Sequence, residues 1–178
     1  MNQKITVVLY DASLRKLASS FHSGNDYLDR FLRVPDSLDD NIGKTYVLAF
    51  EDRKTILGYY NLGVGYIEQI VDGTVRKIGG SIHINCFALD ETYQGLQIWS
   101  PNGGQIKLSD VLLTDCMQRI EDIRRDHLGF TFVTLSSTRE GYHLYLRNGF
   151  EKLDDDMNFS MEETEEGCIP MYYAIDIE

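Results

Sequence analysis

The stretch Ala88-Leu89-Asp90-Glu91-Thr92-Tyr93-Gln94-Gly95 decides the fold, because it stands between a predicted strand and the clearest predicted helix of the chain. The apolar residues over 81–89 indicate a buried strand. Apolar residues then recur at helical spacing over 109–128, where Ser109 can cap the helix and Gly129 can end it. Because a helix N-terminus offers backbone N–H groups to phosphate, this strand, loop and helix form a candidate phosphate-binding unit.

Hydrophobic periodicity predicts the remaining elements. The expected strands cover residues 5–10, 45–51, 56–64, 130–135 and 171–177, with another opening at Phe150, and the expected helices cover residues 14–21, 27–32 and 139–148. Ser23 is the expected cap of the second helix, and the polar turn 52–54 suits a hairpin. The segment 90–105 is expected to be a polar loop. This order predicts one α+β domain over residues 1–178, with a mixed central sheet of about six to seven strands flanked by helices on both faces.

The composition is that of a globular protein, since 178 residues of which 43% are hydrophobic can bury one core. No apolar run is long enough to span a bilayer, and residues 1–7 lack the apolar stretch of a signal peptide, so we expect a cytoplasmic protein. The sparse cysteines Cys86, Cys116 and Cys168 argue against a disulfide framework and against a zinc site.

Acidic residues are concentrated near the C-terminus. The net charge is −11, and residues 151–167 hold eight acidic side chains and one basic side chain, Lys152. Such an excess disfavours general affinity for a polyphosphate backbone. The acidic segment has two interpretations: a solvated loop, or an attractive surface for a basic substrate or partner.

Residues 88–95 resemble the start of the coenzyme A signature of the GNAT acetyltransferase superfamily, in which a strand ends in an Ala-Val-Asp-like run and a Tyr-Gln-Gly-like step follows. The resemblance implies the GNAT fold, acetyl-CoA as co-substrate and no metal. It assigns donor binding to Phe87, Ala88, Leu89, Gln94, Gly95, Lys107, Leu108, Ser109 and Asp110. The chain departs from the pattern by about ten extra residues after Gly95, and by Lys107 and Ser109 at positions where glycines are usual. The alternative is a retained fold that has lost its ligand.

Two further stretches resemble the same superfamily. Residues 142–150 are similar to its Phe-Tyr-x-x-Phe-Gly-Phe close, which implies that Tyr145 is the general acid; the alternative is a packed aromatic side chain. Residues 21–32 resemble the Phe-x-Cys-Gly-x-x-x-Leu-Asn-x-Phe-Leu run of a bacterial branch that includes toxins acetylating aminoacyl-tRNA, and Gly58–Leu62 resembles a strand of that branch.

The resemblance implies direct acyl transfer to an amine. Backbone N–H groups near Phe87–Leu89 would polarise the thioester carbonyl, and Tyr145 would protonate the departing thiolate. Glu68, His83 and Glu91 are the candidates for a base that deprotonates the amine.

Three functions remain open. The main hypothesis is an N-acetyltransferase that transfers an acetyl group from acetyl-CoA to an unidentified amine of a small molecule or peptide. The second is a toxin that acetylates charged tRNA, which the acidic balance opposes and the run 21–32 favours. The third is an acyl-CoA-binding module without turnover. Nucleic acids other than tRNA and membranes are not expected as partners, and edge strands near the C-terminus would allow a homodimer.

Overall fold

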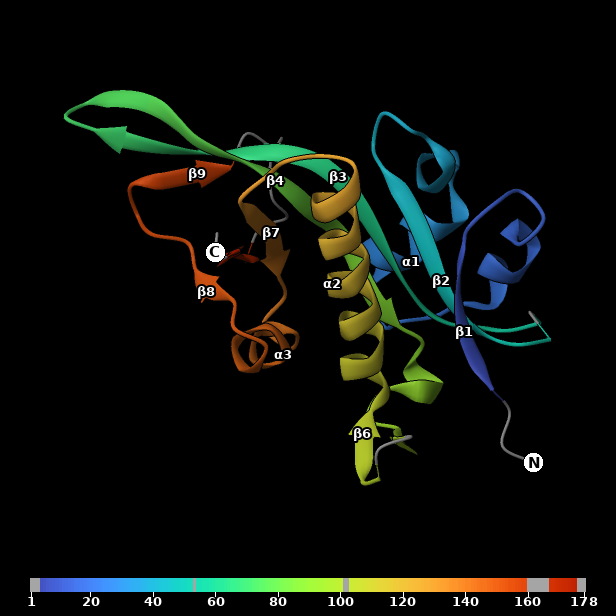
Figure 1. Cartoon of the computed structure of the whole chain (residues 1–178). Coiled ribbons are helices and arrows are strands. Elements are labelled where there is room, and N and C mark those ends of the chain that lie inside the picture. The colour runs from blue at the N-terminus through green and yellow to red at the C-terminus, as the bar shows by residue number, and fades with distance from the viewer. Residues whose placement is uncertain (1–3, 53, 101–102, 160–166, 176–178) are drawn as a thin grey trace. The chain divides into compact units, whose positions relative to one another are not determined.

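The structure is a computed structural model that describes residues 4–52, 54–100, 103–159 and 167–175 (Figure 1). The chain divides into two compact units. The first unit combines residues 1–62 with 86–119, and the second combines residues 63–85 with 120–178. A single domain over the whole chain stays a prediction.

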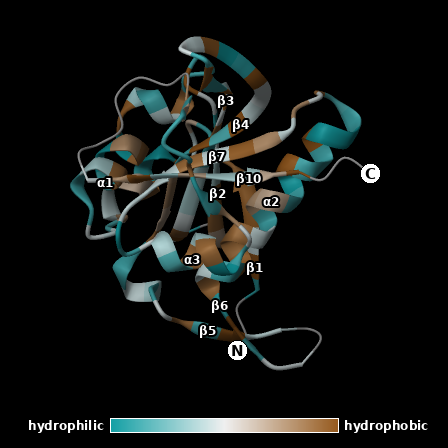
Figure 2. Cartoon of the chain, turned by 90° about the vertical axis from the view of Figure 1, so that its left-hand side faces the viewer, coloured by the Kyte–Doolittle hydropathy of each residue, from teal (hydrophilic) through white to brown (hydrophobic). Residues whose placement is uncertain are grey.

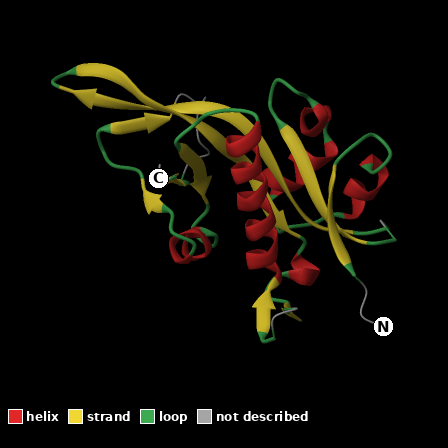
Figure 3. Ribbon diagram, viewed as in Figure 1, coloured by secondary structure: helices red, strands yellow, loops and turns green. Residues whose placement is uncertain are grey.

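The chain combines helices and strands in a mixed order, with runs of consecutive strands (Figure 3). The strands are β1 (Ile5–Leu9), β2 (Lys44–Phe50), β3 (Ile56–Val71), β4 (Thr74–Leu89), β5 (Gln97–Trp99), β6 (Gln105–Lys107), β7 (Phe132–Ser137), β8 (Glu151–Lys152), β9 (Met157–Phe159) and β10 (Ile169–Ala174). The α-helices are α1 (Asp26–Arg33), α2 (Leu108–Asp126) and α3 (Tyr142–Arg147), and the 3₁₀ helices are η1 (Arg15–Ser20), η2 (Pro35–Leu38) and η3 (Glu91–Tyr93). Parallel and antiparallel pairs occur in one sheet of eight strands, which confirms the predicted α+β class with a mixed sheet.

The first unit is built on the antiparallel strands β1, β2 and the first half of β3. Val7 pairs with Leu48, and Val47 pairs with Tyr59. The core on these strands consists of Tyr10, Leu14, Ala18, Phe21, Phe31, Leu32, Val47, Ile56, Tyr59, Cys86 and Ala88. The ring of Tyr59 stacks on Phe31 with 6.2 Å between centroids. The apolar face of α1 therefore packs on the sheet, as its alternating brown and teal residues in Figure 2 suggest.

Two local predictions for the first unit are wrong. The segment 14–21 forms the 3₁₀ helix η1 and not an α-helix. The cap of α1 is Asn25, whose side chain accepts a hydrogen bond from the N–H of Leu28 at 3.1 Å, and not Ser23. Ser23 instead binds the Asp29 carboxylate with both its N–H and its hydroxyl.

A polar network fixes the start of α2 within the first unit. The Tyr60 hydroxyl donates to the Asp115 carboxylate at 2.5 Å, and the Arg119 Nε donates to the Tyr60 oxygen at 2.8 Å. The Arg119 guanidinium also lies 4.1 Å from the ring centre of Tyr46. These contacts hold the helix against β2 and β3.

The second unit is centred on β7. Residues Ser81–Ile84 of β4 run parallel to β7, and β10 pairs antiparallel with β7 and β8. Its buried apolar residues include Val133, Leu135 and Met171. The acidic segment is not a loop throughout, because β8 and β9 form within it and β9 pairs with β3. With these short strands the central sheet has eight strands, compared with the expected six to seven. Residues 160–166, with half of the acids in question, lie outside the described residues.

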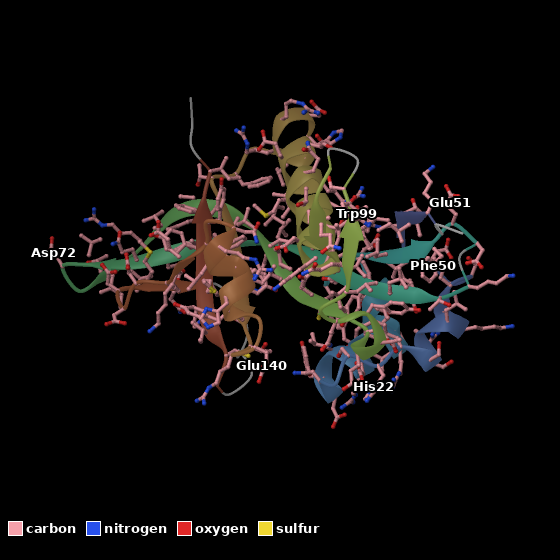
Figure 4. All side chains as sticks on the ribbon, turned by 90° about the horizontal axis from the view of Figure 1, so that it is seen from below. His22, Phe50, Glu51, Asp72, Trp99 and Glu140 are labelled. Atoms are coloured by element: carbon pink, nitrogen blue, oxygen red, sulfur yellow. The ribbon has the colours of Figure 1, made fainter. Side chains whose placement is uncertain are left out.

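The hairpin of β3 and β4 extends much further than predicted. The strands were expected over 56–64 and 81–89, yet they continue to a two-residue turn at Asp72 and Gly73, which Figure 4 shows at the tip. Both turn residues have positive φ, 51° and 73°, as a type I′ turn requires. No helix among the described residues is both long enough and apolar enough to cross a membrane.

Candidate functional site

The C-terminal end of β4 carries the first group of predicted donor-binding residues. The pairing of β4 with β7 covers Ser81–Ile84, and Phe87–Leu89 lie further along β4. The N–H of Asp90 donates to the Leu57 carbonyl on β3 at 2.9 Å. Because successive N–H groups of a strand point to opposite edges, those of Phe87 and Leu89 point away from β3. This geometry suits a ligand that binds along the outer edge of the strand.

The turn after β4 is held by polar side chains. The Asp90 carboxylate accepts a hydrogen bond from the N–H of Thr92 at 3.0 Å and thereby caps η3. The Gln94 amide donates to the carbonyls of Leu89 at 3.0 Å and Ser23 at 2.8 Å. Gly95 follows with a φ of 74°, a left-handed conformation that favours glycine. Gln94 therefore shapes the turn with its side chain, in addition to the donor contact that the resemblance assigned to it.

The inserted residues form a second, two-stranded sheet and not the polar loop that the sequence predicted. β5 and β6 pair antiparallel, with Trp99 opposite Gln105. The hairpin is anchored to α2, since the N–H of Leu108 donates to the Leu96 carbonyl at 2.9 Å. Trp99 projects from β5 and is 72% exposed (Figure 4). The inserted hairpin therefore fixes the direction in which the chain enters α2.

The second group of predicted donor-binding residues lies at the start of α2. Lys107 is exposed and directly precedes the helix, Leu108 is buried, and Ser109 and Asp110 are half-buried in the first turn. The helix begins at Leu108, so Ser109 is not the residue in front of it, as the capping prediction required. The first turn of α2 and the exposed ammonium group of Lys107 lie side by side in sequence, a combination that suits a phosphate.

His22 and Asp29 form a pair that the sequence did not single out. The His22 Nδ1 lies 2.5 Å from Asp29 Oδ2, and the His22 Nε2 lies 3.9 Å from Glu91 Oε2. The hydrogen bond to Asp29, together with the charges of Asp29 and Glu91, raises the pKa of His22 above its ordinary value. Burial opposes ionisation of Asp29, but the hydrogen bonds from Ser23 and His22 outweigh it and lower the pKa of Asp29. The sequence signal for this pair was Asp29, a charged residue on the apolar side of α1.

Tyr145 belongs to the second unit. It lies on α3 and is buried, with its ring edge-on to Phe150 at 5.6 Å between centroids. Its carbonyl accepts hydrogen bonds from the N–H groups of Asn148 at 3.0 Å and Phe150 at 3.1 Å, which end the helix. Tyr145 is thus a packed aromatic side chain, as the alternative interpretation expected. A chemical role for its hydroxyl stays a prediction.

The three predicted bases differ in their surroundings. His83 is buried, its Nδ1 lies 2.8 Å from Thr134 Oγ1, and burial lowers the pKa of His83 to about 4. Such a histidine binds protons poorly, so it does not suit the role. Glu68 pairs with Asn158 in the β3–β9 ladder. Glu91 is exposed and lies two residues after the end of β4, which leaves it as the best placed of the three. Among the described residues, no group of three or more His, Cys, Asp or Glu side chains is arranged to hold a metal ion.

Comparison with known proteins identifies the fold. No protein-family model matches the chain, and none of the curated proteins matches it. The solved structure of AtaTR bound with AcCoA superimposes with a TM-score of 0.72 and 17% identity, covering 98% of this chain and 95% of that one. A Tyr-to-Phe mutant of KacT gives 0.69 and 18%, covering 97% and 95%. AtaT complexed with acetyl-methionyl-tRNAfMet gives 0.65 and 18%, covering 88% and 94%. At these identities the likeness concerns the fold alone, and the chain has the same fold as AtaT and KacT.

Proposed function

We propose that this protein is an N-acetyltransferase that transfers the acetyl group of acetyl-CoA to a primary amine. One observation carries the proposal: N–H groups at the end of β4 alternate in direction, and because that of Asp90 donates to the Leu57 carbonyl on β3, that of Leu89 points to the opposite edge. An extended pantetheine chain can bind there as an added strand does, through main-chain hydrogen bonds. The same N–H groups can polarise a thioester carbonyl, which concentrates negative charge on its oxygen during acyl transfer.

The donor's diphosphate would lie at the start of α2. The N–H of Leu108 is bound by the Leu96 carbonyl, so Ser109 and Asp110 supply the N–H groups of the first turn, and the exposed Lys107 supplies a positive charge. Gln94 and Gly95 shape the turn between Ala88 and this helix. The Asp110 carboxylate is the unfavourable element in this arrangement, because it repels an anion, and Lys107 offsets it.

Tyr145 is the general acid in this proposal. A phenol is a suitable donor for the thiolate that leaves as the amide bond forms, and the position of Tyr145 on α3 matches the GNAT pattern. The structural neighbours include Tyr-to-Phe mutants of KacT and AtaT. These mutants are a further reason to test a tyrosine in this fold.

The neighbours favour a second, narrower candidate, acetylation of the amino group on aminoacyl-tRNA. AtaT was solved with acetyl-methionyl-tRNAfMet, and it was also solved with its antitoxin AtaR and DNA. The net charge of −11 opposes tRNA binding, so this candidate requires a local basic surface. With this function, we expect a bacterial cytoplasmic protein that forms a homodimer and has a protein antitoxin as its partner.

The test begins with calorimetric titration of acetyl-CoA and of coenzyme A. Radiolabelled acetyl transfer is then measured on a panel of unfractionated aminoacyl-tRNA, peptides, polyamines and aminoglycosides. Micromolar donor binding with turnover of a panel amine is the expected result. Donor binding without any turnover would favour an acyl-CoA-binding module, and absence of donor binding would overturn the proposal.

A further inference from the structure

The imidazole of His22, the residue labelled in Figure 4, has contacts to two carboxylates in the first unit. Its Nδ1 contacts Asp29 Oδ2 at 2.5 Å, and its Nε2 lies 3.9 Å from Glu91 Oε2. The His22 side chain is 60% exposed, whereas that of Asp29 is only 3% exposed. A histidine held through one nitrogen by a fixed carboxylate presents its other nitrogen in a defined direction. This is the arrangement of a proton acceptor that solvent or substrate can reach.

Asp29 is fixed by several contacts. Its Oδ1 accepts hydrogen bonds from the Ser23 N–H at 2.7 Å and the Ser23 hydroxyl at 2.6 Å. Its Oδ2 faces His22, with the Arg33 guanidinium 4.0 Å away. A buried carboxylate is stable only when its oxygens are satisfied, and here both are. Asp29 can therefore keep the orientation of the imidazole constant while the exposed nitrogen exchanges protons.

The main chain of His22 is joined to the residues that follow the proposed donor segment. The His22 N–H donates to Asp90 Oδ2 at 2.9 Å, and the His22 carbonyl accepts from the Glu91 N–H at 2.7 Å. Asp90 directly follows Phe87–Leu89, where the thioester is proposed to bind. The imidazole is consequently tied to the end of the strand that would hold the acetyl donor.

We propose that His22 is the general base that deprotonates the acceptor amine, that Asp29 is its positioning residue, and that Glu91 attracts the ammonium form of the acceptor. This inference rests on the proposed acetyltransferase function. The His22 Nε2 takes one proton from the ammonium group, and the freed lone pair attacks the thioester carbonyl carbon. The C–N bond forms as the C–S bond breaks, and the sulfur leaves with the bonding electron pair. A second amine proton neutralises the thiolate through Tyr145, and His22 later releases its proton to water.

The charges around His22 suit this task. Asp29 on α1 and Glu91 on η3 place negative charge beside the imidazole, Arg33 on α1 is the positive group that opposes them, and Asp90 contacts the main-chain N–H of His22. The hydrogen bond to Asp29 and the charges of Asp29 and Glu91 raise the pKa of His22 above its ordinary value, so the imidazole is a stronger proton acceptor than a free histidine. Only the neutral imidazole accepts a proton, so the rate must rise as the pH passes upward through the raised pKa.

Rates with two different acceptor amines distinguish a general base from a residue that has only a structural role. The first is the fastest amine of the panel described above, which must lose a proton before it attacks. The second is hydroxylamine, which is already unprotonated at neutral pH and needs no base. His22→Gln is expected to lower kcat for the panel amine about 10²-fold at pH 7 and to leave the hydroxylamine rate nearly unchanged. His127→Gln, which changes another exposed histidine, is the matched control and should behave as the wild type.

Asp29→Asn and Glu91→Gln provide the second readout. Each removes a negative charge, so each should move the acidic limb of the rate profile to lower pH, and Glu91→Gln should also raise KM for the ammonium acceptor. Equal losses with both acceptors in His22→Gln, or profiles that do not move in either carboxylate variant, would overturn the role of His22 while leaving the acetyltransferase function intact. A wild-type protein that turns over neither acceptor would overturn both.

Discussion

Gly58 on β3 lies so close to Ala88 on β4 that a Cβ atom at Gly58 would stand 2.7 Å from the Ala88 carbonyl oxygen. The same atom would lie 2.6 Å from Leu89 Cδ2 and 3.1 Å from Leu112 Cδ2. The end of β4 and the first turns of α2 thus approach β3 at a single residue without a side chain. These are the two segments to which we assign donor binding.

Gly58→Ala should therefore damage the donor site as well as the fold. The methyl group must displace the backbone of β4, so we expect a loss of about 1–3 kcal/mol in the free energy of unfolding and weaker binding of acetyl-CoA. Chemical denaturation and calorimetry measure the two effects. Gly129→Ala is the control, because nothing lies within 4 Å of the added Cβ. Wild-type affinity in the Gly58→Ala variant would show that this close approach does not shape the site.

Tyr145→Phe tests the proposed acid. The phenyl ring keeps its contact with Phe150, so the fold and the affinity for acetyl-CoA should be retained, while kcat should fall about 10²-fold because the thiolate loses its proton donor. Steady-state kinetics with the fastest panel amine measure the effect. Tyr142→Phe, on the same helix, is the matched control. Equal rates in the two variants would remove Tyr145 from the mechanism.

Lys107→Gln tests the phosphate site at the start of α2. Removing one exposed cation beside a bound diphosphate should weaken acetyl-CoA about 5- to 10-fold, and the loss should shrink as salt is added. Calorimetry at two salt concentrations provides the measurement, and the emission of Trp99, the single tryptophan, offers an independent signal. Lys54→Gln changes an exposed lysine away from α2 and should have no effect. Identical affinities in both variants would place the diphosphate elsewhere.

His83 should make stability depend on pH. Burial lowers the pKa of His83 to about 4, whereas a histidine in the unfolded chain titrates near 6.5. Between these values the unfolded state binds a proton that the folded state refuses, so stability falls as the pH falls, by about 3 kcal/mol in total. Denaturation at pH 7, 5.5 and 4 should show a smaller loss in His83→Gln, whose amide can still contact Thr134. Parallel curves for the two proteins would contradict this assignment.

Local patterns in the sequence were sufficient for much of the fold. The helix over 109–128 was found within two residues of each end, because its buried stripe and its flanking residues are local features. The strand at 81–89 was found for the same reason, although β4 begins earlier, at Thr74. The end of this strand and the start of this helix could therefore be placed by residue number, whereas their role in donor binding stays a prediction.

Features that depend on distant partners were missed. The arm around Asp72 contains several glycines and polar residues, and its long strands are apparent only once they pair. The His22 N–H finds the Asp90 carboxylate 68 residues further along the chain, so no local pattern announces it. Ser23 was assigned the cap because it has the right residue type, but the buried Asp29 carboxylate holds it and leaves the cap to Asn25.

The interleaving of the two compact units has a consequence for biosynthesis. The last residues of the first unit, 86–119, leave the ribosome before residues 120–178, which the second unit requires. The arm of the second unit, with the exposed apolar side chains of Val64, Ile70 and Val75, is therefore made before β7 and β9, the strands that pair with β4 and β3. Until those strands emerge, the nascent chain presents unpaired strand edges, and this interval is when it is most open to aggregation or to capture by a chaperone.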